Sequence, residues 1–134
     1  MNKQELINQA FKAMNHAYAI YSNYHVGSCI LLKDGTTFLG ANIENASFGA
    51  TNCAERSAIY AAYSNGYRKD DIEAIAIVSD GFRIAAPCGI CRQVLSELLP
   101  QNAPIYLSNG KDEVVMTIAE LLPMQFNVED VKHD

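Results

Sequence analysis

The sequence contains no apolar run that approaches the roughly 20 residues with which a helix crosses a bilayer. Residues 1–14 are polar and amphipathic, and they lack the apolar stretch of a secretory signal peptide. We therefore expect a cytoplasmic protein with no membrane partner. Because thiols stay reduced in that compartment, the four cysteines point to a metal site or to catalysis before structural disulfides.

The sequence also lacks a block of positive charge. Its ten Lys and Arg residues are scattered along a chain of net charge −5. Proteins that bind nucleic acids rely on such side chains to displace counterions from phosphates. The composition therefore favours a small, neutral or weakly charged partner over a nucleic acid.

Internal repeats, linkers and low-complexity segments are absent as well. The length of 134 residues is close to the commonest size of one domain. With 49% hydrophobic and 19% charged residues, the composition is typical of a globular protein. We predict a single domain over residues 1–134.

Apolar residues at spacings of three and four predict an amphipathic helix near the start of the chain. These residues are Leu6, Ile7, Ala10, Met14, Ala17, Tyr18 and Tyr21. A polar loop leads to an extended segment at 26–33, and the hairpin signal Asp34-Gly35 connects it to a second at 36–43. We predict two antiparallel strands there.

The remaining elements alternate between helix and strand. They are a helix at 53–63 with Asn52 as its N-cap and Gly66 as its stop, a strand at 73–79, a helix around Val94, Leu95, Leu98 and Leu99, strands at 104–107 and 113–116, a short helix opened by a capping box at Thr117 and Glu120, and a frayed acidic end at 129–134. The central β-α-β-α-β run implies parallel strands joined by right-handed crossovers, and the hairpin adds an antiparallel edge. We predict an α/β fold, a three-layer α-β-α sandwich with a mixed sheet of about five strands.

The motif Cys88-Gly-Ile-Cys91 falls where a helix is expected to begin. Two interpretations fit this motif by itself. A thioredoxin-like redox pair occupies such a position, where the helix dipole favours thiolate. Two cysteines at this spacing are equally half of a zinc site.

A second segment, Thr51-Asn-Cys-Ala-Glu-Arg-Ser57, bears on this choice because Cys53 also lies at a predicted helix start. Two crossover helices that flank one buried strand begin on the same side of a sheet, so the three cysteines can converge. A redox pair has no use for a third thiolate, whereas three thiolates leave a fourth zinc position for water. Glu55, two residues after Cys53, is a candidate acid–base group, although a first-turn Glu also simply favours the helix dipole.

With both cysteine motifs considered together, the chain resembles the small homotetrameric class of cytidine deaminases, whose zinc site and non-ligand Glu have this signature. The resemblance covers nearly the whole chain. The matching segments are Tyr21-Ser22, Val26-Gly27, Asn42-Ile-Glu-Asn-Ala46, Thr51-Asn-Cys-Ala-Glu-Arg56, Pro87-Cys-Gly-Ile-Cys-Arg-Gln93, Leu121-Leu-Pro123 and Phe126.

The resemblance implies one zinc ion per subunit, bound by Cys53, Cys88 and Cys91. It implies that Glu55 shuttles protons while water replaces the amino group at C4 of free cytidine or deoxycytidine. The products would be uridine or deoxyuridine and ammonia, as in pyrimidine salvage. The family also implies a homotetramer in which neighbouring subunits complete each active site.

Five positions resemble the substrate contacts of that family. Asn42 and Glu44 match a pair that holds the ribose 3′-hydroxyl, and the backbone of Ala54 matches a contact to the reacting ring. Tyr24 matches an aromatic beside the base, and Phe126 one that a neighbouring subunit lays over the pyrimidine. The residues alone also fit a polar strand end for the first pair and ordinary core packing for the two aromatics.

Three residues depart from the family pattern: Tyr24 replaces a common Phe, His25 stands where Pro is frequent, and Phe48 stands where Tyr is common. They bear on affinity and not on the reaction, and we expect His25 to be a loop residue and not a metal ligand. Arg56, three residues after Cys53, can reach back along the helix to withdraw charge from the thiolates, or it is an exposed helix residue. Cys29 is predicted to be a small buried hydrophobe.

Three rival functions remain. A related deaminase would act on another aminopyrimidine such as blasticidin S. A closed structural zinc site would need Cys29 or a histidine as fourth ligand and would show no turnover. A redox protein would form a disulfide under mild oxidation.

Overall fold

Five strands form one mixed sheet in the computed structural model, which describes residues 1–131. They are β1 (Val26–Leu32), β2 (Thr37–Ala41), β3 (Ile72–Ser79), β4 (Ile105–Ser108) and β5 (Glu113–Met116). Across the sheet their order is β2-β1-β3-β4-β5. The β3–β4 pair is parallel and the other three pairs are antiparallel, so β2, β3 and β4 point the same way although β1 separates β2 from β3.

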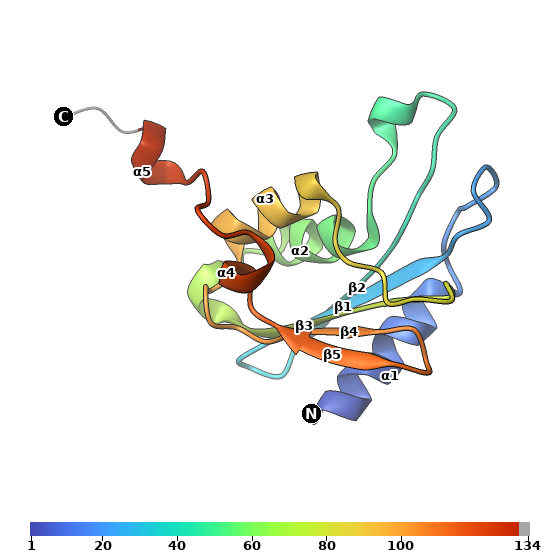
Figure 1. Cartoon of the computed structure of the whole chain (residues 1–134). Helices are drawn as coiled ribbons and strands as arrows, with labels where there is room; N and C mark the ends of the chain where they lie inside the picture. Colours follow the sequence, from blue (N-terminus) through green and yellow to red (C-terminus); the bar gives the residue numbers. More distant parts are fainter. Residues whose placement is uncertain (132–134) are drawn as a thin grey trace.

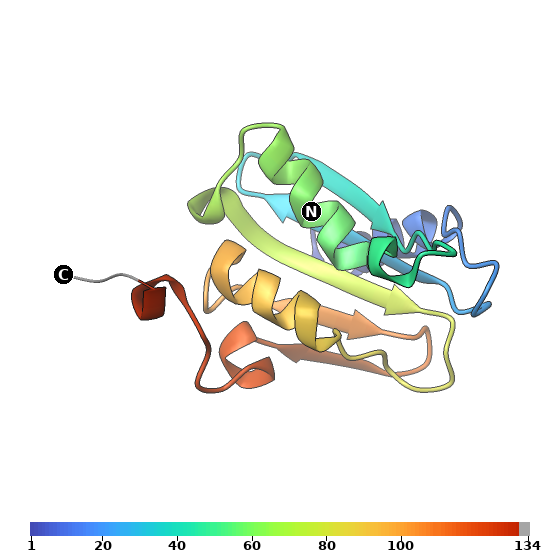
Figure 2. The ribbon, with the colours of Figure 1, turned by 90° about the horizontal axis from the view of Figure 1, so that it is seen from above.

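Helices cover both faces of this sheet (Figures 1 and 2). The α-helices are α1 (Lys3–Met14), α2 (Ala54–Ser64), α3 (Gly89–Leu98), α4 (Ile118–Leu121) and α5 (Val128–Val131), of which α5 lies away from the sheet (Figure 1), and short 3-10 helices occur at Phe48–Ala50 and Lys69–Asp71. α1 packs on one face, and α2 and α3 pack on the other. The predicted three-layer sandwich with a five-stranded mixed sheet is confirmed.

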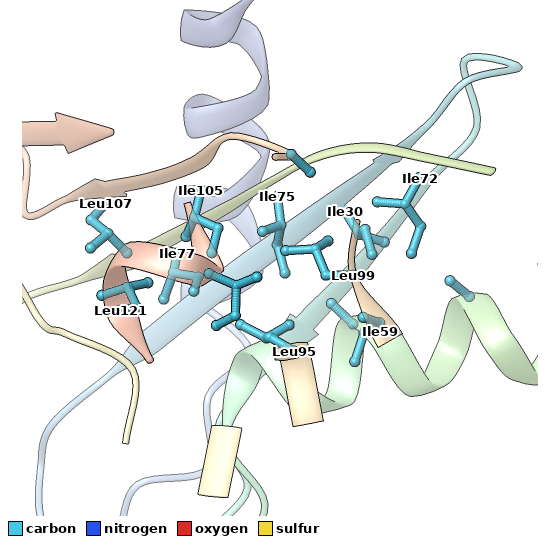
Figure 3. Packing of buried hydrophobic residues seen from close by; sticks show 14 of the residues in the cluster. Ile30, Ile59, Ile72, Ile75, Ile77, Leu95, Leu99, Ile105, Leu107 and Leu121 are labelled. Atoms are coloured by element: carbon cyan, nitrogen blue, oxygen red, sulfur yellow. The ribbon is translucent and has the colours of Figure 1, made fainter. Parts of the chain in front are cut away.

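The two-residue period of the strands divides the core between the two faces. On β1, Cys29 and Leu31 pack with α1, whereas Ile30 and Leu32 belong to the larger cluster under α2 and α3. Figure 3 shows this larger cluster, in which isoleucines of the sheet meet Leu95 from α3. Its burial fixes α2 and α3 over the sheet.

The first helix is shorter than its apolar spacing predicts, because α1 ends at Met14 instead of continuing to Tyr21. His16 N and Ala17 N still donate to carbonyl groups of α1, but from Tyr18 onward the backbone pairs elsewhere. Tyr18 N donates to Asn42 O over 2.9 Å, and Glu44 N donates to Tyr18 O over 2.8 Å. Pairing with the segment after β2 therefore outweighs the helical periodicity.

Two predicted helix ends are confirmed. Gly66, with a φ of +92°, follows the C-cap of α2, and Thr117 and Glu120 form both hydrogen bonds of a capping box on α4. The predicted frayed end at 129–134 is wrong as far as Val131, because α5 is helical there; residues 132–134 lie outside the described residues. Within residues 1–131 no helix is long and apolar enough to cross a membrane.

Candidate active site

A cavity of about 610 Å³ lies at the end of the sheet where α2 and α3 begin. α2 follows β2 and α3 follows β3, and these two strands run in the same direction. In open α/β sheets, ligands bind at this carboxyl end of the strands. The lining residues are Tyr24, Val26, Asn42, Glu44, Thr51, Asn52, Cys53, Ala54, Glu55, Ile77, Gly81, Phe82, Arg83, Ile84, Ala85, Ala86 and Cys88.

The start of α2 is held close to the sheet by Gly40 of β2. A Cβ atom at Gly40 would lie 2.3 Å from Ala54 O and 2.6 Å from Ala58 N, so only glycine permits this approach.

The prediction that Asn52 caps α2 is wrong. Asn52 forms a two-stranded bridge with Ile43 and donates its side chain to Ser57, so Cys53 becomes the N-cap.

The three cysteines of the two motifs come together at these helix starts. The sulfurs of Cys53, Cys88 and Cys91 all lie within 4.8 Å of one another, and those of Cys53 and Cys88 are 3.8 Å apart. Cys88 is the N-cap of α3 and accepts a hydrogen bond from Cys91 N over 3.5 Å. All three are free thiols, and the positive ends of both helix dipoles face them.

This donor set fits a catalytic zinc ion, which takes three protein ligands and keeps one position open. Cys53 and Cys88 line the cavity, so a fourth position there is accessible to a small molecule. Cys29 packs under α1 on the opposite face of the sheet, and within residues 1–131 no histidine joins the cluster. The closed four-ligand site therefore lacks its fourth protein ligand among the described residues.

Glu55 occupies the first turn of α2, two residues after Cys53, and lines the same cavity. Its side chain is 4% exposed. Burial raises the pKa of Glu55 to about 7, and the neighbouring Cys53 thiolate acts in the same direction. A carboxyl group with such a pKa can both accept and donate a proton near neutral pH.

Arg56 reaches back along α2 to the cluster, where its Nη2 donates to Cys53 Sγ over 3.3 Å. Contact with the Cys91 sulfur, and then the hydrogen bond and charge of Arg56, lower the pKa of Cys53 to about 5 against the effect of burial. Among residues 1–131, the Nε of Arg56 is buried and finds no hydrogen-bond partner. The guanidinium is thus directed at the sulfur cluster and not at solvent.

Asn42 and Glu44 both line the cavity and also hold the loop before β1. Asn42 donates to Tyr24 O over 2.8 Å and accepts from Val26 N over 2.9 Å. Glu44 accepts hydrogen bonds from the backbone N of Tyr21 and Ser22 and from the Ser22 hydroxyl. The sequence did not predict this second, structural task.

The other predicted contacts divide into two groups. Tyr24 and Ala54 line the cavity, whereas Phe126 does not line it within one chain. Phe126 is 59% exposed, and its backbone O accepts from Gln93 Nε2 over 2.8 Å. The cavity is also lined by the loop at 81–86, which no sequence motif indicated, although its place directly after a buried strand was a usable signal.

Comparison with known proteins supplies the family. A family model described as the cytidine and deoxycytidylate deaminase zinc-binding region matches residues 1–107. The chain belongs to this family. A cytidine deaminase of Halalkalibacterium halodurans is 49% identical over 132 residues, which cover 98% of this chain and 98% of that relative. The blasticidin-S deaminase of Bacillus cereus is 35% identical over 112 residues, covering 78% of this chain and 79% of that relative.

Among solved structures, the cytidine deaminase from Burkholderia pseudomallei is similar with a TM-score of 0.90 at 42% identity. The match covers 94% of this chain and 100% of that chain. The predicted membership in the cytidine/deoxycytidylate deaminase family and the predicted fold are therefore confirmed. The predicted zinc cofactor is confirmed as well, because the matched family region binds zinc and the three converging sulfurs fit one ion per chain.

Proposed function

We propose that this chain catalyses the hydrolytic deamination of free cytidine and 2′-deoxycytidine to uridine and 2′-deoxyuridine, with release of ammonia, as part of pyrimidine salvage. The observation that carries the proposal is the buried Glu55 beside three clustered thiols at one cavity. Its volume of about 610 Å³ suits a small-molecule ligand. Relatives that match over nearly the full chain are cytidine deaminases.

Cys53, Cys88 and Cys91 would hold the zinc ion, which when bound supplies Lewis-acid chemistry that lowers the pKa of a water molecule. Glu55 accepts a proton from this water while the oxygen of the water bonds to C4 of the base. Glu55 then donates the proton to N3. It next takes the proton of the new C4 hydroxyl and passes it to the amino group. The C4–N4 bond then breaks, so ammonia leaves and the C4 carbonyl forms.

Asn42 and Glu44 would orient the ribose. The Asn42 amide has a second N–H besides the one that it gives to Tyr24 O, and the Glu44 carboxylate accepts several hydrogen bonds. An amide and a carboxylate can therefore serve one sugar hydroxyl as donor and acceptor. Tyr24 would contact the face of the base, and the backbone of Ala54 the reacting ring.

A homotetramer would complete the site, with Phe126 of a neighbouring subunit over the pyrimidine. In support, α5 lies away from the rest of the chain (Figures 1 and 2), and apolar side chains are exposed at Met124, Phe126 and Val128. Sedimentation of the wild type tests the assembly, and four chains are expected. Kinetics of Phe126→Ala test its role at the site, and a raised KM for cytidine is expected. A cytoplasmic location would accompany a free nucleoside substrate.

The reaction is tested by following cytidine absorbance near its ultraviolet maximum, together with ammonia, with and without a strong chelator. Equal amounts of uridine and ammonia, lost with the metal and restored by zinc, support the proposal. Bound zinc without turnover would indicate a structural site, and reduction of insulin disulfides a redox protein. Faster turnover of blasticidin S than of cytidine would favour the rival deaminase. We expect the opposite result, because Asn42 and Glu44 are placed to orient a ribose.

A further inference from the structure

Two loops of the cavity wall meet where β1 begins and β3 ends. Val26 pairs with Ser79, so the loop before β1 and the loop after β3 leave the sheet at the same end (Figures 1 and 2). His25 is the last residue of the loop before β1, and Asp80 is the first residue of the loop after β3. Tyr24 lies one step further along the first loop and Gly81 along the second, and both line the cavity.

Three hydrogen bonds join His25 to Asp80. His25 N donates to Asp80 Oδ1 over 3.0 Å, Asp80 N donates to His25 O over 3.2 Å, and His25 Nδ1 lies 2.6 Å from Asp80 Oδ2. Partial burial raises the pKa of Asp80, but the hydrogen bonds and charge of His25 outweigh burial and hold that pKa below its usual range. An ionised carboxylate only accepts, so Nδ1 of His25 carries the proton.

The ring of Tyr24 lies against the opposite loop on one side, while 38% of the residue stays exposed. A Cβ atom at Gly81 would lie 2.9 Å from Tyr24 Cε1, so the ring packs directly on the glycine of the opposite loop. The Tyr24 backbone is also fixed, since its N donates to Ser22 Oγ over 3.0 Å and its O accepts from Asn42. The His25–Asp80 pair thus joins these two loops through side-chain hydrogen bonds.

We propose that His25 and Asp80 are a positioning pair that holds Tyr24 against Gly81 and thereby sets how tightly the cavity binds its nucleoside. Neither residue touches the reacting atoms in this proposal. The pair acts through Tyr24, so its loss weakens binding and leaves the chemical step intact. The proposal rests on the proposed function for its substrate, cytidine.

The test compares Asp80→Ala with wild type in the zinc-loaded enzyme. KM for cytidine should rise about 3- to 10-fold, less than the full effect of a lost charge-assisted hydrogen bond, because the side chains of the pair are 34% and 38% exposed and the backbone bonds around Tyr24 remain. The kcat, zinc content and melting temperature should stay close to wild type. Asp80→Asn should restore most of the binding, because the amide oxygen can still accept the hydrogen bond that His25 N donates to Asp80 Oδ1.

Two further variants separate positioning from general structure. Tyr24→Leu removes the ring, and in that background Asp80→Ala should change KM by less than about twofold, since residues that act as a unit are not additive. Glu113→Ala breaks the Lys3–Glu113 ion pair of 3.0 Å, whose residues do not line the cavity, and should leave KM unchanged.

Proton NMR gives a readout that needs no turnover. The short bond should move the His25 Nδ1 proton far downfield in the wild type, and the signal should vanish in Asp80→Ala. The proposal would be overturned if Asp80→Ala left KM unchanged or raised it equally in the Tyr24→Leu background. It would also be overturned if Asp80→Ala lowered kcat, zinc content and melting temperature together. A wild type that leaves cytidine unchanged refutes the proposed function and not the pair, which then stands or falls on the downfield proton.

Discussion

Arg56 donates a hydrogen bond from Nη2 to the sulfur of Cys53 over 3.3 Å. The two residues lie three apart at the start of α2, where Cys53 is the N-cap and Arg56 is in the first turn. Three thiolates outweigh the two positive charges of a zinc ion and would weaken it as a Lewis acid. A guanidinium directed at one sulfur offsets part of that excess negative charge.

Arg56→Gln should therefore lower kcat or zinc affinity by roughly 10- to 100-fold, the usual effect of losing a partner of a metal ligand. Arg56→Lys keeps the positive charge but lacks the planar guanidinium, so its kcat and zinc affinity should lie between those of the wild type and of Arg56→Gln. Zinc per chain, measured together with kcat, checks the expectation. If Arg56→Gln kept both its zinc and its rate, Arg56 would have no role at the site.

Glu55→Gln should retain zinc but lose about 10²- to 10⁴-fold in kcat, because general acid–base groups typically contribute that much. The amide is similar in size to the carboxyl and cannot accept and return a proton. Glu97→Gln changes an exposed carboxylate on α3 and is the matched control, expected to match wild type. Loss of zinc from Glu55→Gln would instead make Glu55 a ligand and contradict the mechanism.

Cys29→Ala should keep full zinc occupancy and full activity. Cys29 is fully buried under α1, and burial raises the pKa of its thiol to about 11, so it stays protonated. Removing the sulfur leaves a small cavity, and we expect the free energy of unfolding to fall by about 1 kcal/mol. Denaturant titration and metal analysis check both statements; reduced zinc content would revive the four-cysteine site.

Gly40→Ala should destabilise the fold and disturb the site together. The added methyl group would lie 2.3 Å from Ala54 O, so α2 must move away from β2 and carry Cys53 and Glu55 with it. We expect a loss of about 3 kcal/mol, at the upper end for overpacking, and lower zinc affinity. Gly49→Ala adds its methyl to open space and should behave as wild type.

Much of the fold follows from local pattern. The hairpin, the buried β3 and the capping box of α4 are each specified by a few neighbouring residues. The end of α1 was not predictable in this way, because Ala17 to Tyr21 keep helical spacing while Tyr18 pairs with the segment after β2. The Asn52 cap failed for the same reason, since Asn52 is engaged by Ile43.

The convergence of the three cysteines was predictable because each cysteine lies at a helix start, and parallel strand direction brings helix starts together. Contacts between loops were not predictable. His25 pairs with Asp80, 55 positions away, and nothing in either local sequence specifies the partner. The loop-holding bonds of Asn42 and Glu44 likewise depend on a tertiary path that no periodicity encodes.

The proposed chemistry depends on an open zinc site made by Cys53, Cys88 and Cys91. X-ray absorption at the zinc edge of the purified protein tests it most directly, because sulfur and oxygen neighbours scatter differently. Three sulfurs at about 2.3 Å and one lighter atom near 2.0 Å are expected for such a site. A shell of four sulfurs, or fewer than three, would contradict it.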